Sequence, residues 1–152
     1  MHRSILSRPF WLAVAFGLSA FAIAATPAAS PASASAASCV RFVASNFNAP
    51  GNDNLAANLN GEWVRIKNFC STSKSLSSWT IKDYHSLHTY RFPTGVSIRA
   101  GYSITLYSGR GTNTATKRYW QRSYGAVWNN TPPEYAYLRN AAGVLQSRWT
   151  QY

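Results

Sequence analysis

The stretch GEWVRIKNFCSTSKSLSSWTIKDY, residues 61–84, is the part of this chain that decides its fold class. Within residues 63–67, aliphatic side chains alternate with aromatic or basic ones, which is the period-two pattern of a strand with one buried face. A polar run at 71–75 interrupts the pattern, and it resumes at 79–82. The stretch therefore predicts two strands separated by a break.

The period-two pattern continues through the rest of the chain, and no window shows the apolar face of an amphipathic helix. Further strands are expected at 39–43, 90–92, 102–107, 135–139 and 144–149. A short strand is expected just before a turn at Gly101, and residues 119–120 and 126–128 are expected to be short extended pieces. Residues 46–61 and 109–118 are rich in Asn, Gly and Thr and are expected to be loops. Short strands with closely spaced turns predict an all-β sandwich or barrel, with Trp63, Trp79 and Trp128 filling its core or its ends.

The first 36 residues are not expected to belong to this fold. Arg3 and Arg8 precede the apolar run 10–25, which is shorter than the roughly 20 residues needed to span a bilayer. A segment rich in Ala, Ser and Pro follows it and offers A-x-A cleavage sites at 34–36 and 22–24. We expect residues 1–36 to be a cleaved secretory signal and 37–152 to be one domain with no membrane span. A retained membrane anchor is the alternative.

The charge of the chain is strongly positive. It has 15 Lys and Arg against 4 Asp and Glu, and a formal charge of +11. At 14% aromatic and 12% charged residues it is too apolar to be disordered. Such a chain is expected to attract polyanions.

Export permits a disulfide between Cys39 and Cys70, the two cysteines of the chain. If these cysteines face each other in a hairpin of the first two strands, Val43 lies opposite Ile66. That register would place the apolar residues of the two strands on opposite faces, so it requires a bulge or a bridge just outside the strand. Alternatively, AASC at 36–39 resembles a lipobox, which would make Cys39 a lipidated N-terminus.

Five motifs occur in an order that resembles the lamin tail domain, in the short secreted form of actinomycete-like bacteria. They are GEWVRIKN (61–68), SLSSWTIKD (75–83), YRFPTGVSIRAGYSITLYSGRGTNT (90–114), VWNN (127–130) and AYLRNAAGVL (136–145). The resemblance implies an immunoglobulin-like antiparallel β-sandwich without catalytic residues or cofactors, in a family that serves as an adhesive or scaffolding module. The chain departs from the family pattern at Ser78, where Gly is usual, at 132–134, and in the positions of its cysteines.

Residues 110–124, RGTNTATKRYWQRSY, interleave cations with aromatic rings and are the richest candidate for a binding site. Cations attract polyanions through charge and counterion release, and exposed rings stack on bases or on sugar faces. The candidate ligand-binding residues are Arg110, Lys117, Arg118, Tyr119, Trp120, Arg122 and Tyr124. The alternative is that Tyr119 and Trp120 belong to the core and that the cations only keep the protein soluble.

Other polar clusters are more simply explained as structural. His85 and His88 with Asp83 could hold a metal, but a catalytic zinc usually needs three protein ligands, and Asp83 suits a turn cap. Asp53 and Glu62 among asparagines offer too few carboxylates for calcium.

The sequence thus favours a secreted, non-enzymatic binding module, in the extracellular space or at the cell surface, for an anionic polymer or acidic protein. Cell-wall polymer, extracellular nucleic acid and an acidic protein all fit, and no metal site is expected. One alternative is a small secreted nuclease or other hydrolase using Glu62, Glu134 and His85. Another is a structural surface protein without a specific ligand.

Overall fold

The computed structural model describes residues 38–52, 54–85, 87–130 and 133–151. Its elements are β1 (Val40–Asn46), the 3-10 helix η1 (Leu59–Gly61), β2 (Trp63–Asn68), β3 (Lys74–Ser75), β4 (Thr80–Lys82), β5 (Thr89–Arg91), β6 (Ser97–Ile98), β7 (Ser103–Tyr107), β8 (Lys117–Tyr119), β9 (Glu134–Arg139) and β10 (Leu145–Gln151). The predicted signal segment 1–36 lies outside the described residues. Within the described part of the chain, no helix is long and apolar enough to cross a membrane.

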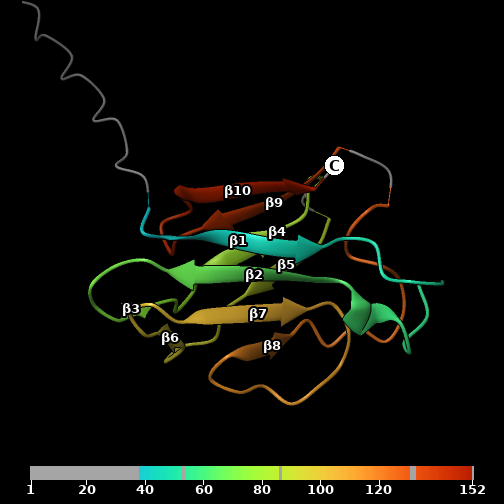
Figure 1. The fold of residues 1–152 in the computed structure, drawn as a ribbon, viewed down its shortest axis with the longest axis horizontal. Coiled ribbons are helices and arrows are strands. Elements are labelled where there is room, and N and C mark those ends of the chain that lie inside the picture. The colour runs from blue at the N-terminus through green and yellow to red at the C-terminus, as the bar shows by residue number, and fades with distance from the viewer. Residues whose placement is uncertain (1–37, 53, 86, 131–132, 152) are drawn as a thin grey trace, which may run out of the picture. The chain divides into compact units, whose positions relative to one another are not determined.

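The strands form two four-stranded sheets, β1-β2-β7-β8 and β10-β9-β4-β5, and a small pair, β3-β6 (Figure 1). The inward residues of β2 and β7 are aliphatic, and they meet those of β4 and β9 in one hydrophobic core, as two-layer packing requires. Val64, Ile66, Ile104 and Leu138 are each at most 1% exposed. The predicted all-β, immunoglobulin-like sandwich is confirmed.

One pair of strands departs from the expected antiparallel arrangement, because β7 and β8 are parallel. Residues 108–116 loop back along the sheet before β8 begins, as the wide turn at the lower edge of Figure 1 shows. Strand β8 accordingly starts at Lys117, inside the segment expected to be a loop. The difference matters because it brings Tyr119 beside Tyr107.

A bulge at Val43 sets the pairing of β1 with β2. Phe42 pairs with Ile66, so the predicted pairing of Val43 with Ile66 is wrong. The two features offered as alternatives to that register, a bulge and a bridge just outside the strand, are both present. Just before the strand, Cys39 and Cys70 form the predicted disulfide, with a Cα–Cα distance of 5.2 Å. Since the sulfur of Cys39 is bonded to Cys70, lipidation of Cys39 is incompatible with this structure.

Two further expectations about local structure need correction. Residues 126–128 form no strand; their backbone is held by side chains instead, for example by Glu62, whose Oε2 accepts the Val127 N–H at 3.0 Å. The polar break at 71–75 contains the short strand β3. Of the three tryptophans expected inside, Trp128 is buried and Trp79 packs against the core, but Trp63 lies half-exposed on the outer face of β2.

Candidate binding face

The three described carboxylates, of Glu62, Asp83 and Glu134, are all buried, with at most 2% exposure. The thirteen described Lys and Arg residues, in contrast, are all exposed or half-buried. Acidic and basic groups are therefore separated between interior and surface. Over the described residues, the solvent-facing side-chain charge is entirely positive.

The buried carboxylates organise loops. Oε2 of Glu134 accepts the Asn129 N–H at 3.0 Å, while its Oε1 accepts the N–H groups of Tyr84 and Tyr135 at 3.0 and 2.9 Å. Asp83 accepts the His88 N–H at 3.1 Å and contacts the His88 ring at 3.2 Å, so it caps the turn as predicted. Glu62 and Glu134, the acidic residues considered for a hydrolase, thus both accept hydrogen bonds from backbone N–H groups of loops.

Cations and rings gather on the outer face of the β1-β2-β7-β8 sheet. Directly paired residues of neighbouring strands share a face. Trp63, Tyr107 and Tyr119 accordingly form one row across β2, β7 and β8. Arg65, Thr105 and Lys117 form the next row, and Arg41 pairs with Lys67 beyond it. We call this surface the basic aromatic face; it comprises Arg41, Trp63, Arg65, Lys67, Phe69, Tyr107, Lys117 and Tyr119.

Cation–π contacts order the side chains of this face. The Arg41 guanidinium carbon lies 4.0 Å from the centroid of the Phe69 ring, and the Lys67 ammonium lies 5.2 Å from it. Arg65 lies 5.1 Å from the Trp63 ring, and its Nε donates to Thr105 Oγ1 at 2.9 Å. Such contacts contribute roughly 0.5–1 kcal/mol each at exposed sites. Arg41, Arg65 and Lys67 are thus positioned by rings, and no described carboxylate pairs with them.

Tyr119 has little free ring surface. One side stacks on Tyr107, with centroids 5.2 Å apart. Gly111 lies so close to the ring that a Cβ there would come within 2.4 Å of it. Tyr119 therefore holds the loop 109–113 against the sheet. Phe69, at 44% exposure, is the most accessible ring of the face.

The segment 110–124 does not form one surface, because the alternation of β8 divides its residues. Lys117 and Tyr119 lie on the basic aromatic face, and Arg110 is exposed in the adjoining loop. Trp120 packs against the core, 6.0 Å from Trp128 and 5.7 Å from Tyr90 between ring centroids.

The remaining three predicted residues lie elsewhere. Arg118 is half-buried and lies beside Tyr90. Burial raises the pKa of the Tyr90 hydroxyl, and the positive charge of Arg118 opposes this rise. Arg122 donates to the backbone oxygens of Gly125 and Tyr124, at 2.9 and 3.3 Å. Tyr124 is 70% exposed, with its backbone bridged to Leu55.

The sequence-based list of candidates omitted six members of the basic aromatic face, namely Arg41, Trp63, Arg65, Lys67, Phe69 and Tyr107. A signal for four of them was present. Because Val64 and Ile66 must face the core, Trp63, Arg65 and Lys67 must face outward on the same strand. Arg41 likewise alternates with two apolar neighbours in the first strand. Tyr107 and Phe69 had no comparable signal, since their place depends on strand pairing and on the chain after β2.

Polar groups elsewhere serve the loops. Asn52 Oδ1 accepts the Asn54 N–H at 3.1 Å, and Asn54 Oδ1 accepts the Ala126 N–H at 3.1 Å. Asp53, considered above for calcium, lies outside the described residues. Across the described ranges, no three His, Cys, Asp or Glu side chains gather where they could hold a metal ion.

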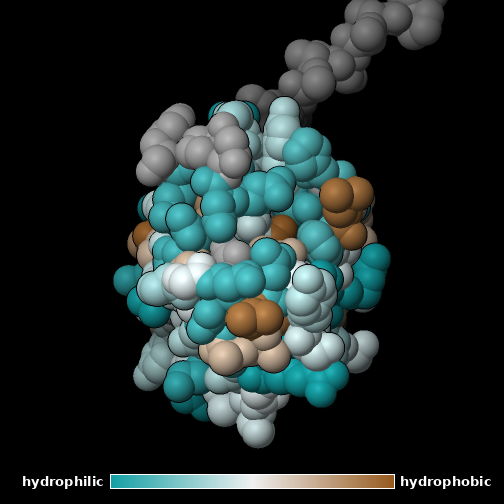
Figure 2. Space-filling view, turned by 90° about the vertical axis from the view of Figure 1, so that its right-hand side faces the viewer, coloured by the Kyte–Doolittle hydropathy of each residue, from teal (hydrophilic) through white to brown (hydrophobic). Residues whose placement is uncertain are grey.

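The loop end of the domain offers no continuous apolar surface. Figure 2 views the end at the right of Figure 1, and it shows a mostly hydrophilic surface with hydrophobic residues in small separate patches. Patches of this kind are normal on soluble domains and do not by themselves indicate an interface. The basic aromatic face is thus the best-defined candidate site.

The fold and the site define an immunoglobulin-like β-sandwich of the binding or structural kind. The family model for the Lamin Tail Domain matches residues 33–152. The chain belongs to the lamin tail domain family. Among curated proteins, none matches this chain.

Proposed function

We propose that this protein is a secreted binding module, of the short bacterial form of the family, whose basic aromatic face holds an anionic partner. The observation that supports this most directly is the separation of charge: the described carboxylates are buried, and Arg41, Lys67 and Lys117 lie together on one sheet face. Cell-wall polymer, extracellular nucleic acid and an acidic protein all carry the required charge. No catalytic step is part of the proposal.

Geometry favours an extended polymer. The cations of the face come from three strands, β1, β2 and β8, so a chain of repeated negative charges contacts several of them at once. Each contact releases counterions, so binding weakens steeply as salt rises. The rings beside the cations add stacking contacts, whose contribution to affinity does not depend on salt.

Two other functions are separable from this one. For a nuclease or hydrolase, an acid and a base would have to converge on one cleft, whereas Glu62 and Glu134 both bind backbone N–H groups in the interior. For a structural surface protein without a ligand, the positive charge would only confer solubility, and its position on the molecule would not matter.

The position of the charge is the testable point. Binding of the purified protein to polyglutamate, teichoic acid and single-stranded DNA should be measured across a salt series. Lys67→Glu/Lys117→Glu changes the basic aromatic face, while Lys82→Glu/Arg148→Glu makes the same change of net charge on the other sheet. We expect the first double variant to lose about 100-fold in affinity at low salt, and the second to lose only a few-fold.

Equal losses in the two variants would show that net charge alone governs binding and would contradict the proposal. Cleavage of RNA or DNA that His85→Ala abolishes would favour the hydrolase. Binding to none of the three polymers at physiological salt would favour the structural protein without a ligand.

A further inference from the structure

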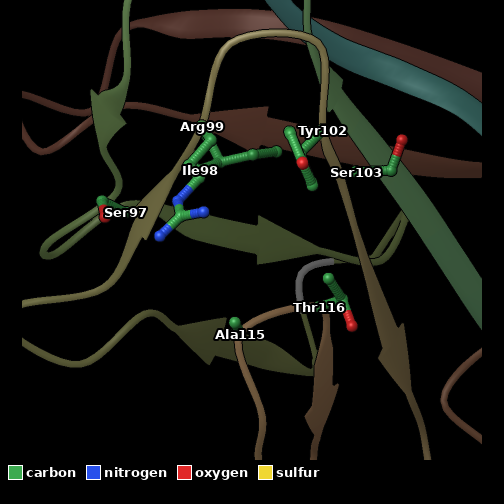
Figure 3. A pocket seen from close by; sticks show the side chains of 7 residues that line it. All are labelled: Ser97, Ile98, Arg99, Tyr102, Ser103, Ala115 and Thr116. Atoms are coloured by element: carbon green, nitrogen blue, oxygen red, sulfur yellow. The ribbon is translucent and has the colours of Figure 1, made fainter.

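A small hollow lies at the edge of the basic aromatic face, between the β6–β7 turn and the segment that leads into β8. It has a volume of about 330 Å³ and is lined by Ser97, Ile98, Arg99, Tyr102, Ser103, Ala115 and Thr116. Figure 3 shows the Arg99 guanidinium projecting into the space that these segments enclose. This volume falls at the lower end of the range for small-molecule sites.

The polar side chains of the hollow are not used by the fold. No hydrogen bond or ion pair to another described residue engages the side chains of Ser97, Arg99, Tyr102, Ser103 or Thr116. Arg122 and Arg139, by contrast, donate to loop carbonyl oxygens. The five donors of Arg99 therefore remain available to a ligand.

The lining combines one cation, one ring, small methyl groups and hydroxyls. Tyr102 is 56% exposed, and it offers a flat apolar surface across from Ala115 and Thr116 (Figure 3). In this view the hydroxyls of Ser103 and Thr116 point away from Arg99, which leaves those of Ser97 and Tyr102 as hydrogen-bonding groups of the hollow. None of the described carboxylates lines the hollow.

The hollow also adjoins the cations of the face. Ser103 is the strand partner of Lys67, and Thr116 directly precedes Lys117. A polymer lying across Lys67 and Lys117 can thus place one of its units in the hollow. The hollow is large enough for one unit of such a polymer, and the neighbouring face is large enough for several units.

We propose that the hollow binds one acidic sugar residue, a sugar ring carrying a carboxylate or a phosphate, and that the preferred polymer is an acidic polysaccharide. The anionic group pairs with Arg99, whose planar fork matches both carboxylate and phosphate. The C–H face of the sugar lies on Tyr102, and its hydroxyls meet lining hydroxyls that both donate and accept. The preference for an acidic polysaccharide rests on the proposed function, whereas the binding of a single acidic sugar does not.

The lining favours a sugar over a nucleic acid base. Specific recognition of a base edge uses amide, carboxylate or guanidinium groups in paired geometry. Here the groups other than Arg99 are hydroxyls, methyls and one ring, and Arg99 is needed for the anion. A neutral sugar, in turn, would leave the guanidinium without its partner.

The test is a chemical-shift titration of the isotope-labelled protein with D-glucuronate, glucose 6-phosphate, D-glucose, acetate and AMP at equal ionic strength. Glucuronate or glucose 6-phosphate should shift the amides of residues 97–103 and 115–117, and these two arms distinguish carboxylate from phosphate. Glucose and acetate should bind at least about tenfold more weakly, because each lacks half of the recognised chemistry. Preference for AMP over both acidic sugars would overturn the proposal in favour of a nucleotide site.

Variants provide the second part of the test. Arg99→Gln and Tyr102→Ala should each weaken sugar binding about tenfold or more, which is the usual effect of losing a charge-assisted hydrogen bond or a stacked ring. Arg148→Gln and Tyr124→Ala remove the same groups elsewhere and should change nothing. Unaltered binding by Arg99→Gln would overturn the inference. If Arg99→Gln still binds polygalacturonate normally while Lys67→Glu/Lys117→Glu does not, the proposed function survives and the sugar site fails.

Discussion

The outer faces of the two sheets carry the same kinds of side chain, but they arrange them differently. On the β10-β9-β4-β5 sheet, Tyr84, Tyr135 and Tyr137 pack on one another, with ring centroids 5.2 and 6.2 Å apart. We call this the tyrosine face; it also includes Lys82, Arg139 and Arg148. Its Arg139 donates to the Gly143 carbonyl oxygen at 3.0 Å, and Arg148 lies 5.3 Å from the Tyr135 ring.

On the basic aromatic face, Trp63, Tyr107 and Tyr119 also lie in one row, but the cations occupy the rows beside it. Arg41, Lys67 and Lys117 make no hydrogen bond through their side chains to another described residue. A similar composition thus yields one face whose arginines are held by a loop carbonyl and a tyrosine ring, and another on which cations of paired strands lie side by side. The contrast shows that the arrangement of cations, more than their number, distinguishes a candidate site from ordinary surface.

The largest expected effect comes from the disulfide, which links the residue before β1 to the segment after β2, beside the basic aromatic face. Cys39→Ser/Cys70→Ser opens a link between residues 31 apart and should lower the free energy of unfolding by about 3 kcal/mol. Phe69, whose N–H donates to the Cys39 oxygen at 2.7 Å, should become more mobile. Urea denaturation measures the first effect, and amide exchange at 67–70 measures the second. Equal loosening of the tyrosine face would contradict this separation of the two faces.

Glu134→Gln should affect the opposite face. The glutamate accepts three N–H groups, and an amide in its place presents only one acceptor oxygen. Because a donor is then left unsatisfied in the interior, stability should fall by about 2 kcal/mol, and the segment whose N–H loses its acceptor, at Asn129 or at Tyr84, should lose its fixed position. Polymer affinity at temperatures where the variant is folded should stay unchanged. A parallel loss of affinity would mean that the tyrosine face takes part in binding.

Gly111→Ala sharpens the account of Tyr119. The new methyl would overlap the ring, so the ring must shift, at a cost of about 1–3 kcal/mol. The double variant Gly111→Ala/Tyr119→Ala has room for the methyl and serves as the control. If Gly111→Ala alone is as stable as the wild type in urea, the loop 109–113 is not held by this contact.

Ser78→Gly tests backbone strain without touching either face. Ser78 has a φ of 64°, in the left-handed region that glycine adopts without steric cost. The substitution should stabilise the protein by up to about 1 kcal/mol, with polymer affinity unchanged. Gly95 has a φ of 83° and open space around it, so Gly95→Ala should lower the stability of the protein instead of raising it.

The sequence predicted the layers of this fold better than its surface. Alternation in residues 63–67 establishes which side of β2 is buried. Together with the alternation of the first strand it indicated a bulge or a bridge just outside the strand, and both are present. The row formed by Trp63, Tyr107 and Tyr119 depends on the parallel pairing of β7 with β8, which is set by the path of residues 108–116. Likewise, Glu62 and Glu134 resemble an acid–base pair until their backbone partners are known. Local periodicity determines which residues face outward, while long-range pairing determines which of them meet.

The smallest expected effect concerns Tyr90, at the open edge between β5 and β8. Burial raises the pKa of its hydroxyl above the ordinary value near 10, and the nearby charge of Arg118 opposes the rise. Below pH 10 the side chain is protonated in both the folded and the unfolded state, so it adds no pH dependence. Above pH 10 the unfolded state loses this proton first, so stability should fall as pH rises through the folded pKa.

Tyr90→Phe removes this contribution. Its stability should fall less than that of the wild type between pH 10 and 11, as measured by urea denaturation at each pH, with Tyr124→Phe as the exposed control. Spectrophotometric titration should show one fewer late-ionising tyrosine. If the free energy of unfolding falls equally steeply above pH 10 in the wild type and in Tyr90→Phe, Tyr90 ionises equally readily in the folded and in the unfolded state. In that case the edge beside β8 is open to water, and Arg118 is as available to a ligand as the cations of the basic aromatic face.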